Sequence, residues 1–170
     1  MAVAYAVVKT GTGSALVAAD RGRVVASFLP GPKPEALVRR LRERFPDAAP
    51  ADEKSVPGAG EMRRWLEGDP TALASVPVDL GDAPPFAGRV YRELRKVPPG
   101  RTLTYKELAR RAGSPRAVRA VGRAMATNRL APFVPCHRVI GSDGKLTGYS
   151  APGGLALKAR FLAAEARANP

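Results

Sequence analysis

Short hydrophobic runs open the chain and predict a small sheet. The runs VAYAVVKT, SALVAAD and RVVASFL are rich in β-forming residues, and the last two are separated by the turn DRG, which favours a meander or hairpins. In PEALVRRLRERF the pattern changes to a helical one: Pro34 opens the segment, and Leu37, Leu41 and Phe45 share one face with Val38. The first part of the chain therefore predicts a small α+β unit.

The region that follows is less regular. Residues 46–60 are predicted as loop, EMRRWLEGD as a short helix, and Trp65 as a core or interface residue. The segment VPVDLGDAPPF is rich in Pro and Gly and resembles a linker. We predict an N-terminal α+β supporting domain at 1–77, a linker at 78–85 and a second domain at 86–170.

The second domain is predicted to be mostly helical. The segment PFAGRVYRELRKV places Phe86, Val90, Tyr91 and Leu94 on one face before PPGR ends the helix. In TYKELARRAG, Thr104 has capping-box spacing to its partner glutamate, three residues on, and the helix is expected to end at a glycine.

A second short helix is expected to follow at once, in SPRAVRAVGRAM. Ser114 is its predicted N-cap and Pro115 its first residue. Two short helices joined by a tight turn that contains glycine are typical of a helix-turn-helix. The predicted fold class is therefore α+β, a small α+β domain followed by a mostly helical domain with a helix-turn-helix.

Charge separates the two halves. Residues 1–84 carry 11 Lys+Arg and 11 Asp+Glu, whereas residues 85–170 carry 17 and 4, so the whole net charge of +13 lies in the second half. A positive field on one module attracts a polyanion such as nucleic acid. A basic surface without a partner is the alternative.

The second short helix is basic but low in bulk. Arg116, Arg119 and Arg123 alternate with small residues, and the side chains that usually read base edges are absent. We therefore expect DNA binding directed by shape, with arginines on phosphates or in place of a displaced base. To the same DNA-binding face we assign Ala117, Ala120, Gly122 and Thr104.

The segment APFVPCHRVIG contains the only cysteine and the only histidine of the chain, Cys136 and His137. Cys136 could be a small core residue, and the pair cannot supply a closed zinc site. If Cys136 is instead a nucleophile, it would react as the thiolate, and the positive charges of Arg138 and of the basic module would favour that form. Neighbours on an extended chain point to opposite faces, so a turn or a bridging water should connect the two.

A histidine base needs a carboxylate to orient it. The basic half offers Glu93, Glu107, Asp143 and Glu165. Glu107 is assigned to the cap and Asp143 to the turn SDGK, which leaves Glu93 and Glu165, the latter on the closing helix GLALKARFLAAE.

The motifs VPCHRVIG and GYSAPGGLALKARFLAAE resemble those of the O6-alkylguanine-DNA alkyltransferases, whose hallmark is Pro-Cys-His-Arg-Val. The resemblance covers residues 86–166 closely and the first half only in its general layout, for which it implies a ribonuclease H-like domain. It implies that Cys136 accepts the alkyl group, that His137 is a base acting through water, and that Glu165 orients that histidine.

The resemblance assigns further roles. Tyr105 would stabilise the guanine leaving group, Arg119 would enter the base stack, and Asn128 would be a hinge. Tyr149 and Ser150 would belong to a loop that closes over the flipped base. As alternatives, Tyr105 could only pack in the helix pair, Asn128 could only cap a helix, and Ser150 could only make a turn. Within the same motif we also assign Arg138 and Val139 to substrate binding.

The implied function is repair of DNA that contains O6-alkylguanine, and of O4-alkylthymine in some cases. Base flipping would precede an irreversible, single-turnover transfer to Cys136. The cysteine and histidine ligands of the zinc-bound N-terminal domain found in some members are absent, so we expect no metal and no cofactor.

The single cysteine and the absence of a signal peptide or membrane-length segment favour the cytoplasm and no membrane partner. We expect a monomer in solution and leave cooperative binding along DNA open. Two other functions remain open: a non-catalytic helix-turn-helix regulator or lesion sensor, and a cysteine hydrolase, although the sequence has no clear oxyanion site.

Overall fold

The computed structural model describes residues 2–31 and 33–168. The chain divides into two compact units. Unit 1 extends to Gly81 and also includes Arg129–Phe133, whereas unit 2 contains Asp82–Asn128 and the chain from Val134 onward. The predicted domain ranges did not foresee that residues 129–133 join the first unit.

The sheet of unit 1 has the order β3-β2-β1-β4. Strands β1 (Ala4–Thr10), β2 (Gly13–Asp20) and β3 (Arg23–Gly31) form the expected antiparallel meander. The β2–β3 turn has positive φ at both central residues, +48° at Arg21 and +79° at Gly22, as a type I′ hairpin requires.

Two segments predicted as irregular pair with this sheet. Within the predicted loop 46–60, β4 (Ala49–Pro50) runs parallel to β1, and the 3₁₀ helix η1 (Glu53–Ser55) follows it. At the start of the predicted linker, Val78 forms a parallel bridge to Val24. Both pairings are too short to produce an alternating hydrophobic pattern, so the sequence did not reveal them.

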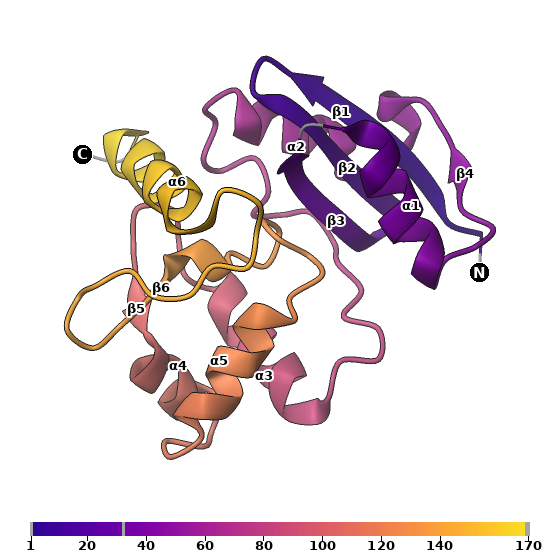
Figure 1. Cartoon of the computed structure of the whole chain (residues 1–170). Helices are drawn as coiled ribbons and strands as arrows, with labels where there is room; N and C mark the ends of the chain where they lie inside the picture. Colours follow the sequence, from indigo (N-terminus) through magenta and orange to yellow (C-terminus); the bar gives the residue numbers. More distant parts are fainter. Residues whose placement is uncertain (1, 32, 169–170) are drawn as a thin grey trace. The chain divides into compact units, whose positions relative to one another are not determined.

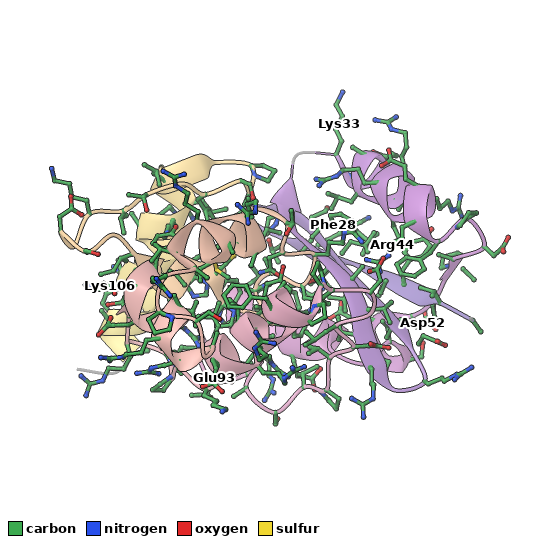
Figure 2. The ribbon with its side chains drawn as sticks, turned by 90° about the horizontal axis from the view of Figure 1, so that it is seen from below. Phe28, Lys33, Arg44, Asp52, Glu93 and Lys106 are labelled. Atoms are coloured by element: carbon green, nitrogen blue, oxygen red, sulfur yellow. The ribbon has the colours of Figure 1, made fainter. Side chains whose placement is uncertain are left out.

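Unit 1 buries both faces of its sheet. Helix α1 (Pro34–Arg44) contributes Leu37 and Leu41 to a cluster with Tyr5, Leu16 and other strand residues, and Phe28, labelled in Figure 2, packs against it. On the other face, the turn before α2 (Ala59–Leu66) lies so close that a Cβ at Gly58 would be 2.7 Å from Val24 Cγ2. Trp65 on α2 is buried, as predicted.

Unit 2 is mostly helical (Figure 1). Helix α3 (Pro85–Arg95) buries Val90, Tyr91 and Leu94 as expected, while Phe86 is only half-buried. The Tyr91 hydroxyl donates to the Ala124 carbonyl at 2.7 Å and so ties α3 to α5 (Val118–Ala126). None of the helices in the described residues is long and apolar enough to span a bilayer.

Helix α4 (Tyr105–Arg111) has the predicted capping box. The Thr104 side chain accepts from the Glu107 amide at 3.1 Å, and the Glu107 carboxylate accepts from the Thr104 amide at 2.7 Å. The predicted start of the next helix was wrong. Ser114 begins a separate turn, closed by the Ala117 amide at 2.9 Å, and α5 starts only at Val118.

A short pair of parallel strands leads to the closing helix. Strand β5 (Leu103–Thr104) pairs with β6 (Val139–Ile140), which directly follows the 3₁₀ helix η2 (Cys136–Arg138). Because β5 also precedes α4, this pairing brings the start of α4 and the Cys136 segment together. Helix α6 (Gly154–Ala168) completes the unit.

Candidate active site

A cavity of about 440 Å³ in unit 2 contains Cys136 in its wall, a volume in the range of small-molecule sites. The wall is formed by the start of α4, one side of α5, the cysteine and the loop before α6. Its lining residues are Tyr105, Gly122, Met125, Ala126, Cys136, Thr147, Gly148, Tyr149 and Ser150.

Five of the sequence-predicted site residues therefore meet at one cavity: Tyr105, Gly122, Cys136, Tyr149 and Ser150. The others lie outside its wall: Thr104, Arg116, Ala117, Arg119, Ala120, Arg123, Asn128, His137, Arg138, Val139 and Glu165. Of the two residues assigned to substrate binding beside the cysteine, Val139 is fully buried in the core and Arg138 donates to Glu165.

The Cys-His pair lies on a turn, as the sequence analysis required. The Arg138 amide donates to the Pro135 carbonyl at 3.0 Å, which closes the single 3₁₀ turn of η2. This turn leaves Cys136 at the cavity and places His137 in the interior, with exposed fractions of 7% and 0%. The two side chains therefore have different surroundings although they are neighbours in sequence.

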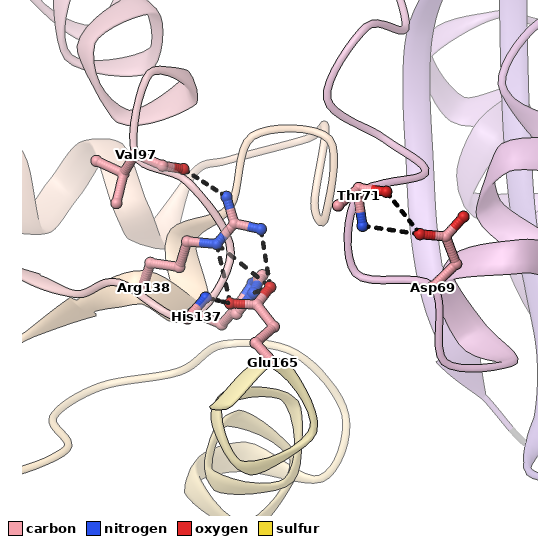
Figure 3. Close-up of polar contacts among 7 residues, drawn as sticks. Asp69, Thr71, Val97, His137, Arg138 and Glu165 are labelled. Atoms are coloured by element: carbon pink, nitrogen blue, oxygen red, sulfur yellow. Dashed lines mark hydrogen bonds and ion pairs between the residues drawn. The ribbon is translucent and has the colours of Figure 1, made fainter. Parts of the chain in front are cut away.

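A buried polar cluster surrounds His137 (Figure 3). His137 Nε2 lies 2.7 Å from Glu165 Oε1, and the Arg138 guanidinium donates to the same carboxylate, with Nη2 2.8 Å from Oε1. Arg138 Nη1 also donates to the Val97 carbonyl at 2.7 Å, and the Gly100 amide donates to Glu165 at 3.3 Å. Glu165 is only 2% exposed, so this carboxylate is held almost entirely by protein donors.

The surroundings determine the charge states in this cluster. Burial opposes ionisation of Glu165, but hydrogen bonds from His137 and Arg138 outweigh it and lower the Glu165 pKa to about 2. Burial lowers the pKa of His137 in spite of the opposing effect of Glu165, so this histidine is neutral at pH 7.

Those charge states define the histidine tautomer. An ionised carboxylate can only accept hydrogen bonds, so His137 Nε2 must carry the proton that points to Glu165. Nδ1 of the neutral ring is then an acceptor, and this is the nitrogen that Glu165 does not use. His137 is therefore arranged to act as a base through Nδ1.

Cys136 is a protonated thiol in this setting. Burial raises the pKa of Cys136 and outweighs the opposing effects of the Asn128 side chain and the Lys158 charge. The expected help from Arg138 is not observed, because its guanidinium is neutralised by Glu165. The thiolate must therefore be formed by a base during the reaction rather than stored beforehand.

Asn128 connects α5 to the cysteine segment. It lies two residues after α5, and its side-chain Nδ2 donates to the Val134 carbonyl at 2.9 Å. The same side chain lowers the pKa of Cys136 through a hydrogen bond. Asn128 thus holds the backbone before Cys136 and acts on the thiol itself.

The loop of residues 147–150 closes one side of the cavity. The Tyr105 hydroxyl lies 3.4 Å from the Thr147 carbonyl, and the Ser150 hydroxyl lies 3.4 Å from the Ala126 carbonyl. Burial raises the pKa of Tyr149, and Cys136 raises it further through its charge and through a side-chain hydrogen bond. The loop therefore presents a protonated phenol to the region of the thiol.

Sequence reasoning missed Lys158 on α6. Its side chain is fully buried, and Nζ donates to the Thr147 carbonyl at 3.0 Å. A lysine in LALKAR has the usual appearance of a solvated helix residue. The signal that could have identified it is its distance of seven residues from Glu165, which places both on one helical face.

Helix α5 has a basic outer side and a side that contributes to the cavity. Arg119 and Arg123 are exposed, as is Arg116 in the turn before the helix. Val121 and Ala124, two of the small residues between these arginines, are buried and pack on the inner side of the helix. Gly122 lines the cavity, so the arginine-bearing helix also borders the space that contains the thiol.

Metal ligands do not gather around this site. Within residues 2–31 and 33–168, no group of three or more His, Cys, Asp or Glu side chains is placed to hold a metal ion. The Glu165 carboxylate of the site already forms hydrogen bonds with the His137 imidazole and with Arg138.

Residues 85–167 match the family described as the DNA-binding domain of 6-O-methylguanine DNA methyltransferase. The inducible methylated-DNA–protein-cysteine methyltransferase of Bacillus subtilis is 39% identical over 79% of this chain and 74% of its own length. The methylated-DNA–protein-cysteine methyltransferase of Methanosarcina acetivorans is 35% identical over 95% of this chain and 97% of its own length.

A longer relative is the bifunctional transcriptional activator/DNA repair enzyme Ada of Escherichia coli, 39% identical over 98% of this chain. The chain spans about half the length of the Ada relatives that it matches, 46% in each case. Among solved structures, the O6-methylguanine methyltransferase of Mycobacterium tuberculosis has a TM-score of 0.72 at 30% identity, covering 99% of this chain and 95% of that one. A complex of the Mycobacterium tuberculosis protein OGT with DNA has a TM-score of 0.70 at 30% identity, covering 95% and 92%.

Proposed function

The chain belongs to the family of methylated-DNA–protein-cysteine methyltransferases, and from this we propose that it repairs O6-alkylguanine in DNA by transferring the alkyl group to its own Cys136. The observation that carries the proposal is the placement of one protonated thiol in the cavity wall, next in sequence to a neutral histidine that is bonded to an ionised carboxylate. This arrangement can remove the thiol proton when substrate is present and protect the thiol when it is absent.

In the proposed reaction, the Cys136 proton passes through one water to His137 Nδ1. Glu165 stabilises the imidazolium that results, because its negative charge lies 2.7 Å from Nε2. The thiolate attacks the alkyl carbon on O6, a sulfur–carbon bond forms, and the carbon–oxygen bond breaks. Guanine leaves as its anion and is then protonated.

Tyr105 is the proposed partner of the leaving group. Its hydroxyl is at the cavity wall, where it can donate to the departing base. Tyr149 and Ser150 would enclose the flipped base from the loop side. Release of guanine then leaves a thioether on Cys136, and no second cysteine exists in the chain to resolve it. Each molecule should therefore act once.

We propose that α4 and α5 act as a helix-turn-helix. The exposed Arg116 and Arg123 would contact phosphates, and the exposed Arg119 would occupy the position of the flipped base. The small residues Ala117, Ala120 and Gly122 permit close approach to the groove, and Thr104 lies at the start of the first helix. Flipping moves the lesion from the duplex toward the cavity that α5 borders.

For unit 1 we propose a supporting role and a ribonuclease H-like arrangement. The antiparallel β1–β2–β3 meander with β4 parallel to β1 is consistent with that topology. We further propose that the protein is monomeric, acts in the cytoplasm and needs no cofactor.

The test is to mix the protein with a duplex that contains one O6-methylguanine and to locate the methyl group by peptide mass spectrometry. We expect a methyl group on the peptide that contains Cys136, and no transfer by Cys136→Ser, since a serine hydroxyl stays protonated and is a poor nucleophile. Affinity of that variant for the damaged duplex should stay within a few-fold of wild type. Methylation of Cys136→Ser would reject Cys136 as acceptor.

A further inference from the structure

Helix α6 buries two charged side chains of opposite sign. Lys158 and Glu165 are its buried residues within 154–168, with exposed fractions of 0% and 2%. They are seven residues apart and therefore share a face. Glu165 serves the histidine cluster described above, whereas Lys158 donates to the loop carbonyl of Thr147 and acts on that cluster only through its charge, which helps to lower the His137 pKa.

Lys158 is compensated by the loop rather than by a counter-ion. Its Nζ donates to the Thr147 carbonyl at 3.0 Å and lies 5.9 Å from the centre of the Tyr149 ring. Among the described residues no carboxylate forms an ion pair with Lys158, and burial lowers its pKa. A buried ammonium with such partners costs free energy that a methionine of similar length would not.

The contacts of Lys158 converge on the cavity. The Thr147 carbonyl accepts from Lys158 and is also within 3.4 Å of the Tyr105 hydroxyl. Thr147, Tyr149 and Tyr105 all line the cavity that contains Cys136. One carbonyl thus links the buried lysine, the loop and the proposed leaving-group donor.

We propose that Lys158 is a positioning residue that holds the 147–150 loop against the cavity through the Thr147 carbonyl and the Tyr149 ring. The consequence for repair rests on the proposed function, because a displaced loop would leave the flipped base and Tyr105 without their alignment. The ammonium charge adds a second effect in the same direction, since it favours the Cys136 thiolate.

The first test measures the loop in the absence of DNA. Lys158→Met removes the charge and the hydrogen bond but keeps most of the volume. Lys145→Met is the matched control, because it removes an exposed lysine from the same connection before α6. We expect amide hydrogen exchange of residues 147–150 to rise about tenfold or more in Lys158→Met and to stay at the wild-type rate in Lys145→Met.

The melting temperature separates positioning from a structural role. We expect that of Lys158→Met to equal or exceed the wild-type value, because a buried unpaired charge has been removed. Unchanged exchange in the loop would overturn the proposal. A lower melting temperature with faster exchange throughout unit 2 would also overturn it, since Lys158 would then be a structural residue.

The second test measures methyl transfer from an O6-methylguanine duplex. Lys158→Met should react at least tenfold more slowly, with affinity for undamaged duplex within twofold of wild type, while Lys145→Met reacts within twofold. Transfer at the wild-type rate in Lys158→Met would overturn the positioning role. If wild type itself transfers no methyl group, the proposed function fails, and the exchange experiment still decides whether Lys158 holds the loop.

Discussion

Replacement of Glu165 by glutamine tests the buried cluster on which the proposed base depends. Glu165 is 2% exposed and accepts hydrogen bonds from His137, Arg138 and the Gly100 amide. Glutamine keeps the shape but removes the charge, so the Arg138 guanidinium is left buried without its counter-ion. The amide can also donate, which makes either tautomer of His137 acceptable.

The expected loss of folding stability in Glu165→Gln follows from the pKa shift and from the usual cost of breaking a buried ion pair. The Glu165 pKa falls from 4.5 to about 2, and each unit of pKa corresponds to about 1.4 kcal/mol, which gives about 3 kcal/mol. Removal of one partner from a buried ion pair typically costs about 3–5 kcal/mol. We therefore expect Glu165→Gln to lower the free energy of unfolding by about 3 kcal/mol at pH 7.

Denaturant unfolding at several pH values is the assay. Because the Glu165 pKa is lowered on folding, its stabilisation is complete above the unfolded value of 4.5 and is lost as the pH falls toward about 2. The difference between wild type and Glu165→Gln must therefore narrow below about pH 4.5. Glu93→Gln is the control, since Glu93 pairs with the exposed Lys96 at 2.6 Å, and exposed pairs contribute about 1 kcal/mol at most.

A loss of stability below about 1 kcal/mol in Glu165→Gln, equal to that of Glu93→Gln, would refute the account of the cluster. So would a difference that stays constant from pH 7 to pH 3. In the repair assay, Glu165→Gln should transfer methyl groups about a hundredfold or more slowly, in line with the usual contribution of a general base.

Three further predictions concern the base, the basic helix and the charge. Burial lowers the His137 pKa, so the neutral base persists at lower pH. The transfer rate should therefore be level from about pH 8 to about pH 6.5, the ordinary pKa of histidine. A pH–rate profile with its midpoint above that value would contradict the assignment of His137 as the base. Arg119→Ala should slow repair in duplex DNA more than reaction with free O6-benzylguanine, and an equal loss with both substrates would place Arg119 in folding or chemistry. Affinity for DNA should fall steeply as the salt concentration rises, because the net charge of +13 lies in residues 85–170 and binding releases counterions. An affinity that does not depend on salt would exclude this electrostatic mode of binding.

The sequence was most informative where chemistry is concentrated in rare residues. The single cysteine and histidine identify the segment for which we propose the reaction, and a basic half with only four carboxylates leaves few candidates to orient the histidine. The structure places Glu165, rather than Glu93, beside His137. The buried face of α3 around Tyr91 and the capping box at Thr104 were also predicted from the sequence, because both depend on residues that are close in the chain.

What the sequence could not reveal depends on distant contacts. Arg138 looked like an activating charge beside Cys136, but a carboxylate 27 residues away neutralises it. Lys158 resembled a solvated helix residue, and only the loop contact to Thr147 shows otherwise. The late start of α5 was also not predicted, because the Ala117 amide closes a separate backbone turn on the Ser114 carbonyl before the helix begins at Val118.

Cys136 is proposed to be consumed in a single reaction, and the stoichiometry of methyl transfer tests this irreversibility most directly. A duplex with a radiolabelled O6-methylguanine is titrated in excess against a known amount of active protein, and protein-bound label is followed to its end point together with the methyl groups lost from DNA. We expect both quantities to plateau at one methyl group per protein molecule. Continued loss of methyl groups from DNA beyond one equivalent would show turnover, and Cys136 could not then be an irreversible acceptor.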